Sequence, residues 1–314
     1  MKSPHFPLKI KKRGVLKEQT TPTSSVISGI IGDGLEIGDR FPVAVMGVIN
    51  TTENSFYSGS VRRSPDDILK TAIEMEKAGA AIIDIGARST APYREYDISE
   101  QVETRVLRDA IRAIKGKVQV PISADTTRIG PARIAIKEGV EMINDAYGFT
   151  QRNANEFAHL IASKECSLLI TAHEGRSGVI HEPIQRVSTA LARALSIAEK
   201  AGITSNKIVV DPGIGFFSDS EISNAEWNCR VIEMLPELRV FKRPVCVGVS
   251  RKKFIGTLTD GKPAEARLAG SLAATSIAVV RGAHIVRTHD VPETVDAVRV
   301  ATALRDAQPN RFAT

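Results

Sequence analysis

The chain has 314 residues, of which 42% are hydrophobic and 25% are charged, so it can bury a large core within one barrel-sized domain. No apolar run approaches the ~18 residues that a membrane-spanning helix needs. The formal net charge is +6, but residues 1–28 carry six lysines and arginines against one glutamate, which leaves the rest of the chain nearly neutral. A basic nucleic-acid groove across the folded body is therefore disfavoured, whereas a local anion pocket is compatible with this balance.

The first 28 residues are basic, contain Ser, Thr and Pro, and lack the uninterrupted apolar core of a secretory signal. We expect a disordered basic tail over 1–28 and one domain over 29–314. An organellar transit peptide is the alternative for the tail. The three cysteines, Cys166, Cys229 and Cys246, are odd in number and widely spaced, which indicates buried thiols in a reducing, cytoplasmic compartment.

Taken in chain order, residues 30–37 alternate around an Asp-Gly turn, which predicts a short β-hairpin placed to plug one end of a barrel. From residue 43 onward, short strand-like runs alternate with segments of helical periodicity. Strands are expected over 43–49, 81–85, 119–124, 140–144, 167–171, 207–210, 244–248 and 284–287. Helices are expected over 65–79, 99–115, 128–139, 153–164, 184–201, 221–235, 263–281 and 291–305, several of them ending at a glycine.

This regular alternation predicts an α/β fold, namely a (β/α)8 TIM barrel with an N-terminal β-hairpin and a basic N-terminal tail. An open doubly wound sheet is the alternative. It is disfavoured because no Gly-x-Gly-x-x-Gly motif follows the first strand.

Several of the expected strands end in a polar side chain. An apolar strand stops at Asp211, followed by one proline and two glycines, while Asp125 and Asn144 end the third and fourth strands. In a barrel these three converge on one mouth. Two carboxylates and an amide suit a flat heterocycle that carries adjacent N–H donors and a carbonyl. For each acid taken alone, capping of the following helix is the alternative.

Strands seven and eight bring cations to the same rim. Ser250, Arg251 and Lys252 follow strand seven directly, and a lysine beside the acids would be an oriented donor. Arg287 and His289 end strand eight before a helix start, where barrels often bind phosphate. The simpler interpretations are a solvated charged surface and a structural histidine.

At these residues the chain resembles dihydropteroate synthases, from about residue 37 to about residue 304. The resemblance is carried by 46–50, Ser89-Thr90, 124–126, 143–145, 211–216, 248–252 with 254–256, and 287–291. It implies that the pterin ring is bound by Asp125, Asn144, Asp211 and Lys252. It implies that Asn50, Arg287 and His289 hold a diphosphate, with Asn50 near a Mg²⁺ ion. It implies that the arylamine side is lined by Phe56, Thr90, Pro92, Phe216, Ser250 and Arg251.

The reaction implied by the resemblance joins a 6-hydroxymethyl-dihydropterin diphosphate to p-aminobenzoate or a related arylamine and expels diphosphate, a step of folate biosynthesis. The resemblance also implies a homodimer. The chain departs from the usual family wording at Glu53, Asn54, Ser58, Arg88 and Ala91, at His173 and Glu174, and at Ser218. Most of these changes fall on the arylamine side, which makes a modified arylamine, such as a ribosylated one, an alternative substrate. The wording of 56–61 is closer to archaeal members.

Two other functions fit a pterin-binding barrel. A methyltransferase that moves a methyl group from a methyl-tetrahydropterin to a corrinoid has no diphosphate to hold, so the cations at 250–252 and 287–289 argue against it. A non-catalytic pterin-binding protein is the second alternative. Turnover in the presence of Mg²⁺ would separate it from the synthase.

Overall fold

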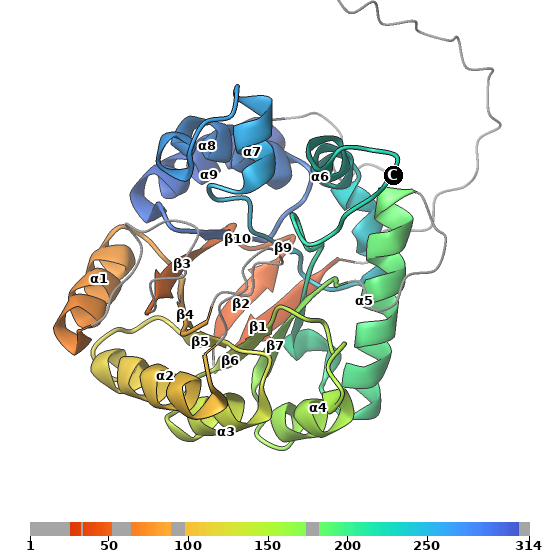
Figure 1. Cartoon of the computed structure of the whole chain (residues 1–314). Helices are drawn as coiled ribbons and strands as arrows, with labels where there is room; N and C mark the ends of the chain where they lie inside the picture. Colours follow the sequence, from red (N-terminus) through yellow and green to blue (C-terminus); the bar gives the residue numbers. More distant parts are fainter. Residues whose placement is uncertain (1–25, 33, 52–63, 89–97, 174–181, 308–314) are drawn as a thin grey trace, which may run out of the picture.

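The computed structural model describes residues 26–32, 34–51, 64–88, 98–173 and 182–307. Parallel strands form a barrel that is ringed by helices (Figure 1). The strands are β3 (Ala44–Asn50), β4 (Ile82–Gly86), β5 (Ile122–Asp125), β6 (Met142–Asp145), β7 (Ser167–Thr171), β8 (Ile208–Asp211), β9 (Cys246–Val247) and β10 (Ile285–Thr288). They pair in the order β8-β7-β6-β5-β4-β3-β10-β9, and a parallel bridge between Val210 and Val245 closes the ring. The predicted barrel is confirmed.

The helices are α1 (Pro65–Lys77), α2 (Glu100–Ile114), α3 (Ile129–Lys137), α4 (Ala154–Ala162), α5 (Pro183–Lys200), α6 (Asn224–Glu233), α7 (Lys253–Leu258), α8 (Leu268–Val280) and α9 (Val291–Asp306). Short 3-10 turns lie at η2 (Ser205–Lys207), η3 (Leu235–Phe241) and η4 (Ala264–Ala266). All eight expected helices are present, and the sequence did not predict the short α7. Within the described ranges, no helix is both long and apolar enough to cross a membrane.

Local sequence signals set the helix ends. Ser64 caps α1 by accepting from the backbone N–H of Asp67 at 3.1 Å, and Pro65 occupies the first helical position, where its missing N–H is not needed. After α3 the chain turns at Gly139, whose φ of 90° lies in the left-handed region that favours glycine. Such caps return the chain to the next strand after each helix.

The predicted N-terminal hairpin is also confirmed. β1 (Ser28–Ile31) pairs antiparallel with β2 (Leu35–Gly38), and the pair lies across one end of the barrel (Figure 1). Ile31 and Ile37 are fully buried and pack on the lower inward-facing residues of the barrel. The hairpin therefore seals the end opposite the carboxyl ends of the strands.

A partly buried ion cluster fixes this seal in place. The Asp39 carboxylate, just after β2, accepts from both Nη atoms of Arg239 at 2.8 Å and from the Ile27 backbone N–H at 2.8 Å, and it lies 3.2 Å from His284 Nε2. Although burial opposes it, Arg239 and His284 hold the pKa of Asp39 well below its usual range. The hairpin is thus tied to both η3 and β10.

Candidate active site

The two-residue period of the strands builds the site. Inward-facing side chains alternate along each strand, and the lower ones form a separate apolar cluster inside the barrel. Two residues further along, the inward position is polar; the pairs are Ile82 and Asp84, Met142 and Asn144, Leu169 and Thr171, Val209 and Asp211, and Ile285 and Arg287. The change from apolar to polar occurs at a similar height in five strands, which gives a polar layer at the carboxyl end.

Strand register brings the predicted pterin residues together. Asn50 pairs with Gly86, Gly86 with Asp125, and Asp125 with Asn144, so these four positions form one row across β3 to β6. Asp125 and Asn144 are 7% and 3% exposed. Asp211 is equally buried, and burial raises its pKa against the effect of Lys252.

The turn after β8 aims the Asp211 carboxylate. Its Oδ1 accepts from the Gly213 N–H at 2.7 Å. Gly213 has a φ of 72°, and a Cβ added there would lie 2.2 Å from the Ala172 carbonyl oxygen. Both the backbone conformation and the close packing require glycine at position 213, which accounts for the glycine in the Asp-Pro-Gly sequence at this strand end.

Arg287 reaches across the barrel to two carboxylates. Its Nε lies 2.7 Å from Asp84 Oδ2, and its Nη2 lies 2.6 Å from Asp84 Oδ2 and 2.8 Å from Asp125 Oδ2. Although burial opposes the charged form, the two acids raise the pKa of Arg287 above its usual value, so the guanidinium is permanently charged. Its third nitrogen, Nη1, contacts no acceptor in the described part of the chain.

The polar layer has unused acceptors. Within the described residues, Asp84 Oδ1, Asp125 Oδ1 and Asn144 Oδ1 are buried and accept no hydrogen bond. Burial raises the pKa of Asp125 to about 7, with Arg287 opposing the rise and Asp84 adding to it. Buried acceptors without donors cost free energy. The layer is therefore suited to a ligand that supplies N–H donors.

Lys252 and Phe216 lie side by side at the same rim. Lys252 Nζ donates to the carbonyl of Ile214 and lies 5.3 Å from the centre of the Phe216 ring. Burial lowers the pKa of Lys252 to about 8, with Asp211 opposing. His173 lies edge-on to Phe216, their ring centres 6.0 Å apart. The Lys252 amine, the Asp211 carboxylate and the Phe216 ring thus lie together at this rim.

His289 and Ser250 join the ends of β10 and β9. His289 Nδ1 and Ser250 Oγ are 2.9 Å apart, and the backbone N–H of His289 donates to the same hydroxyl at 3.2 Å. Burial, assisted by Arg287, lowers the pKa of His289 to about 4, while Asp290 opposes the change. The imidazole is therefore neutral at neutral pH.

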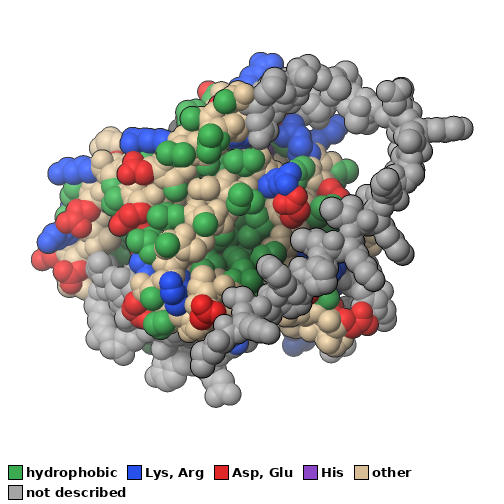
Figure 2. Space-filling view, turned by 90° about the horizontal axis from the view of Figure 1, so that it is seen from above, with side chains coloured by type: hydrophobic (Ala, Val, Ile, Leu, Met, Phe, Trp, Pro, Cys, Tyr) green, Lys and Arg blue, Asp and Glu red, His purple; other side chains and the backbone are tan. Residues whose placement is uncertain are grey.

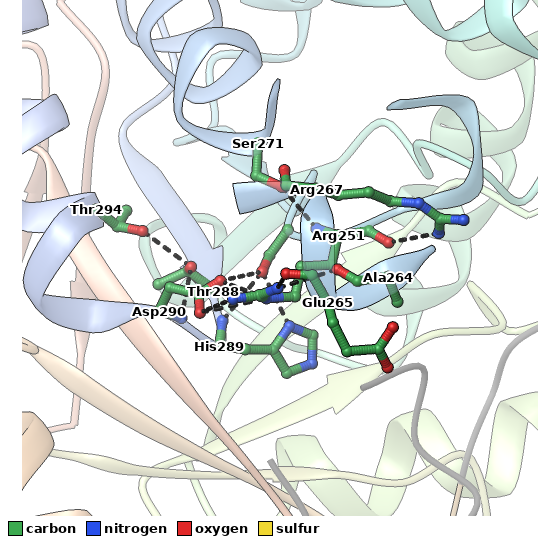
Figure 3. A network of polar contacts seen from close by, with 10 residues as sticks. Arg251, Ala264, Glu265, Arg267, Ser271, Thr288, His289, Asp290 and Thr294 are labelled. Atoms are coloured by element: carbon green, nitrogen blue, oxygen red, sulfur yellow. Dashed lines mark hydrogen bonds and ion pairs between the residues drawn. The ribbon is translucent and has the colours of Figure 1, made fainter. Parts of the chain in front are cut away.

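Arg251 forms the link between these two loops. Its guanidinium contacts the Asp290 carboxylate at 2.7 to 3.2 Å and donates to the carbonyls of Ala264 and Glu265 at 3.0 and 2.8 Å (Figure 3). Its backbone N–H donates to Ser271 Oγ at 2.9 Å, and its φ of 54° is left-handed. Arg251 thus links the β9–α7 and β10–α9 loops to η4, and its predicted place on the arylamine side stays a prediction.

Arg88, at a position where the sequence differs from that usual in the family, lies near Asp125. Its Nη2 donates to Thr127 Oγ1 at 2.7 Å, and its Nε lies 3.6 Å from the buried Glu103. The guanidinium carbon lies 5.6 Å from the centre of the Tyr147 ring. Arg88 thus adds a second cation near Asp125 and lowers the pKa of that acid in opposition to burial.

The structure brings most of the expected residues to one mouth. Asn50, Asp125, Asn144, Asp211, Phe216, Ser250, Lys252, Arg287 and His289 all lie at or just after the carboxyl ends of strands. Phe56, Thr90 and Pro92 lie outside the described residues. The sequence interpretation gave no role to Asp84 or Asp290. A carboxylate in the middle of the apolar run Ile82–Gly86, at an inward position, was the available signal for Asp84.

A Mg²⁺ site would have to rely on few protein ligands. In the described ranges no group of three or more His, Cys, Asp or Glu side chains could hold a metal. Mg²⁺ on phosphate substrates often takes only one or two protein oxygens and draws the rest from phosphate and water. The Asn50 amide, at the end of β3 and in the same strand row as Asp125, has a hard oxygen of this kind. The residues present thus fit an ion carried mainly by its substrate.

Comparisons with known proteins agree with this geometry. The model of the pterin binding enzyme family matches residues 46–289. Dihydropteroate synthase of Escherichia coli strain K12 is 36% identical over 274 residues, covering 85% of this chain and 93% of that protein.

Solved structures are similar over nearly the whole chain. The Yersinia pestis dihydropteroate synthase with a sulfonamide drug superposes with a TM-score of 0.80 at 30% identity and covers 89% of this chain and 100% of that one. The Coxiella burnetii enzyme in complex with pteroic acid has a TM-score of 0.77 at 33% identity and covers 90% and 100%. The chain therefore belongs to the pterin binding enzyme family, and within it to the dihydropteroate synthases.

Proposed function

We propose that this chain condenses 6-hydroxymethyl-7,8-dihydropterin diphosphate with p-aminobenzoate or a related arylamine and releases diphosphate. The observation that carries the proposal is the row of buried, unpartnered acceptors on Asp125 and Asn144, bordered by Lys252 and Arg287. A pterin ring offers the complementary edge, with N–H donors for the acceptors and a carbonyl for the lysine.

In the proposed complex, Asp211 and Asp125 accept from ring N–H groups as carboxylates. Donation from the ligand to a charged acceptor contributes roughly 1.5 to 3 kcal/mol per bond. Lys252, held next to Asp211 and Phe216, donates to the ring carbonyl. The electron-rich ring then spreads the positive charge that develops at the exocyclic methylene as the carbon–oxygen bond to diphosphate breaks.

Arg287 and His289 bind the diphosphate in this proposal. Arg287 Nη1 is available to an anion while Nε and Nη2 hold the two acids, and the neutral His289 adds a donor without a second buried charge. Asn50 would hold a Mg²⁺ ion together with the substrate, and such an ion would further neutralise the leaving group. Arg287→Ala should weaken pterin diphosphate more than the pterin alcohol; calorimetry showing equal weakening would contradict this role.

The arylamine enters beside Phe216 and Ser250. Ser250 is held by His289, so its hydroxyl is fixed, and the Phe216 ring lies against His173, with ring centres 6.0 Å apart. The Coxiella burnetii relative was solved with pteroic acid, which joins a pterin to an aminobenzoate unit. The sequence at Arg88 and His173 differs from that usual in the family. The two substrate classes to compare are therefore p-aminobenzoate and larger arylamines.

Diphosphate release tests the proposal. Purified protein is mixed with the pterin diphosphate, Mg²⁺ and a panel of arylamines. The released diphosphate is converted to phosphate by pyrophosphatase, and the phosphate is quantified. Release that requires an arylamine supports the synthase. Tight pterin binding without release would instead favour a non-catalytic pterin-binding protein. Methyl transfer from a methyl-tetrahydropterin to a corrinoid would favour the methyltransferase alternative.

We also propose that the enzyme is a homodimer in the cytoplasm. An apolar groove of about 360 Å³ lies between α6, α7 and α8 and is lined by Ile232, Phe254, Ile255, Leu258, Ala274 and Ile277. Figure 2, which views the molecule from the side where α7 and α8 lie at the top of Figure 1, shows apolar side chains gathered on this face. Leu258 and Ile277 are 57% and 50% exposed. Apolar area of this kind commonly marks an interface.

Sedimentation of two variants tests the dimer. Leu258→Glu places a charge in the groove and should shift the protein to monomer. Val300→Glu, at an exposed position of α9 that is 62% exposed, is the matched control and should leave a dimer. A wild-type protein that sediments as a monomer at micromolar concentration would contradict the proposal. The three cysteines, all within described segments, are free thiols, which supports a reducing location. Cys166 and Cys246 are buried as expected, whereas the expectation was wrong for Cys229, which lies on the exposed side of α6.

A further inference from the structure

We propose that Asp84 is a positioning residue that determines which face of the Asn144 amide meets the ligand, and thereby makes this part of the pterin site accept rather than donate hydrogen bonds. The inference rests on the proposed function. Asp84 lies one strand away from Asp125 and is completely buried, with no exposed surface of its own.

The argument begins with the contacts of a single oxygen. Asp84 Oδ2 accepts from Arg287 Nε at 2.7 Å and from Asn144 Nδ2 at 3.1 Å, and it forms an ion pair with Arg287 Nη2 at 2.6 Å. A carboxylate in an ion pair can only accept, so the Asn144 atom that faces it must be the NH₂ group. The orientation of the Asn144 amide thus follows from chemistry.

The orientation of the Asn144 amide determines where its oxygen lies. With Nδ2 turned to Asp84, Asn144 Oδ1 faces away from it, and this oxygen is buried and accepts no hydrogen bond in the described part of the chain. Asp125, its neighbour in the strand row, also has a buried Oδ1 without a donor. Two adjacent acceptors are thereby presented to one ligand edge, and a ligand without N–H donors leaves both unsatisfied.

Arg287 makes this arrangement depend on Asp84. The guanidinium can only donate, so without the Asp84 carboxylate it would seek other acceptors. Asn144 Oδ1 is the alternative acceptor for Arg287. Asn144 and Arg287 both donate to the same oxygen of Asp84, so their side chains lie close together. Turning that oxygen to Arg287 would present the NH₂ group to the donors of the ligand and oppose binding.

Three variants test the proposal with the pterin alcohol as probe, measured by calorimetry on the full chain. Asp84→Leu removes the acceptor at similar volume, and affinity should fall by about tenfold to a hundredfold. Asp84→Asn keeps an oxygen at the Oδ2 position and should stay within about fivefold of wild type. Adding Asn144→Asp to Asp84→Leu makes position 144 an acceptor in either orientation and supplies a carboxylate to Arg287, so affinity should recover to within about tenfold.

Thermal unfolding of each variant separates this role from simple loss of structure. If Asp84→Leu does not fold, the double variant and Asp84→Asn carry the test, because each keeps an acceptor for Arg287. A folded double variant that binds no better than a hundredfold below wild type, or Asp84→Asn falling as far as Asp84→Leu, would overturn the proposal. Wild-type protein that does not bind the pterin alcohol would instead contradict the proposed function itself.

Discussion

Asp290→Asn tests whether Arg251 is a clamp or a substrate ligand. Arg251 and Asp290 are 6% and 11% exposed, and their contacts are 2.7 to 3.2 Å long. Removing one partner of a buried pair commonly costs about 3 to 5 kcal/mol, because the other charge is left without compensation. Asparagine keeps one acceptor oxygen, so we expect a loss near the lower end, about 3 kcal/mol.

The expected melting shift follows from the size of the chain. Unfolding entropies of roughly 2.1 cal/mol/K per residue give about 0.66 kcal/mol/K for a chain of 314 residues, so a loss of about 3 kcal/mol lowers the melting temperature by about 4.5 °C. Differential scanning calorimetry measures this directly. Asp296→Asn is the matched control, because Asp296 and Arg299 in α9 form a pair that is 79% and 74% exposed, and it should leave the melting temperature unchanged.

Kinetics distinguish the two roles of Arg251. As a clamp it sets the positions of Ser250 and His289, so Asp290→Asn and Arg251→Lys should both lower the melting temperature and reduce kcat. As an arylamine ligand it would raise the arylamine KM on substitution and leave the melting temperature unchanged. That second outcome, found in both variants, would refute the clamp.

Further predictions concern Asp211, Asp125 and Asp39. Asp211→Asn should weaken pterin binding about tenfold to a hundredfold, because a neutral amide replaces a charged acceptor; calorimetry checks this, and unchanged affinity would remove Asp211 from the site. Burial raises the pKa of Asp125 to about 7, against Arg287, so pterin affinity should fall by up to tenfold per pH unit below about 7, more steeply in wild type than in Asp125→Asn. Without ligand the sign reverses: the raised pKa adds stability that is complete below about pH 4 and lost as pH rises through about 7, so thermal scans of wild type should decline over that window relative to Asp125→Asn. Asp39→Asn should lower the free energy of unfolding, measured in urea, by about 2 kcal/mol, since Arg239 is 35% exposed and the pair is only partly buried. An unchanged unfolding midpoint would show that the Asp39–Arg239 pair does not stabilise the protein.

The barrel could be predicted from the sequence because local signals agree with the fold. Each strand run is short and apolar and is followed by a periodic helix, and glycine or proline marks most junctions. α7 was missed because it is only six residues long and begins within the charged run after β9. A helix of that length has no periodicity to recognise.

The candidate site was predictable only in part. Strand ends such as Asp125, Asn144 and Asp211 are visible in the sequence, since a parallel barrel collects them at one rim. The contacts that long side chains make across the barrel are not visible in the sequence. Arg287 reaches β4 and β5, which lie on the far side of β3 in the ring, and this depends on closure of the barrel and on barrel width. The ion pair between Arg251 and Asp290, 39 positions apart, was likewise not visible in the sequence.

The identity of the condensation product tests the central claim most directly. Protein, Mg²⁺, 6-hydroxymethyl-7,8-dihydropterin diphosphate and p-aminobenzoate are incubated, and the mixture is analysed by mass spectrometry together with a diphosphate assay. A dihydropteroate synthase yields one pterin–arylamine conjugate for each diphosphate released, and Asp211→Asn should reduce both equally. Diphosphate released without a conjugate, or no release from a protein that binds the pterin tightly, would contradict the account.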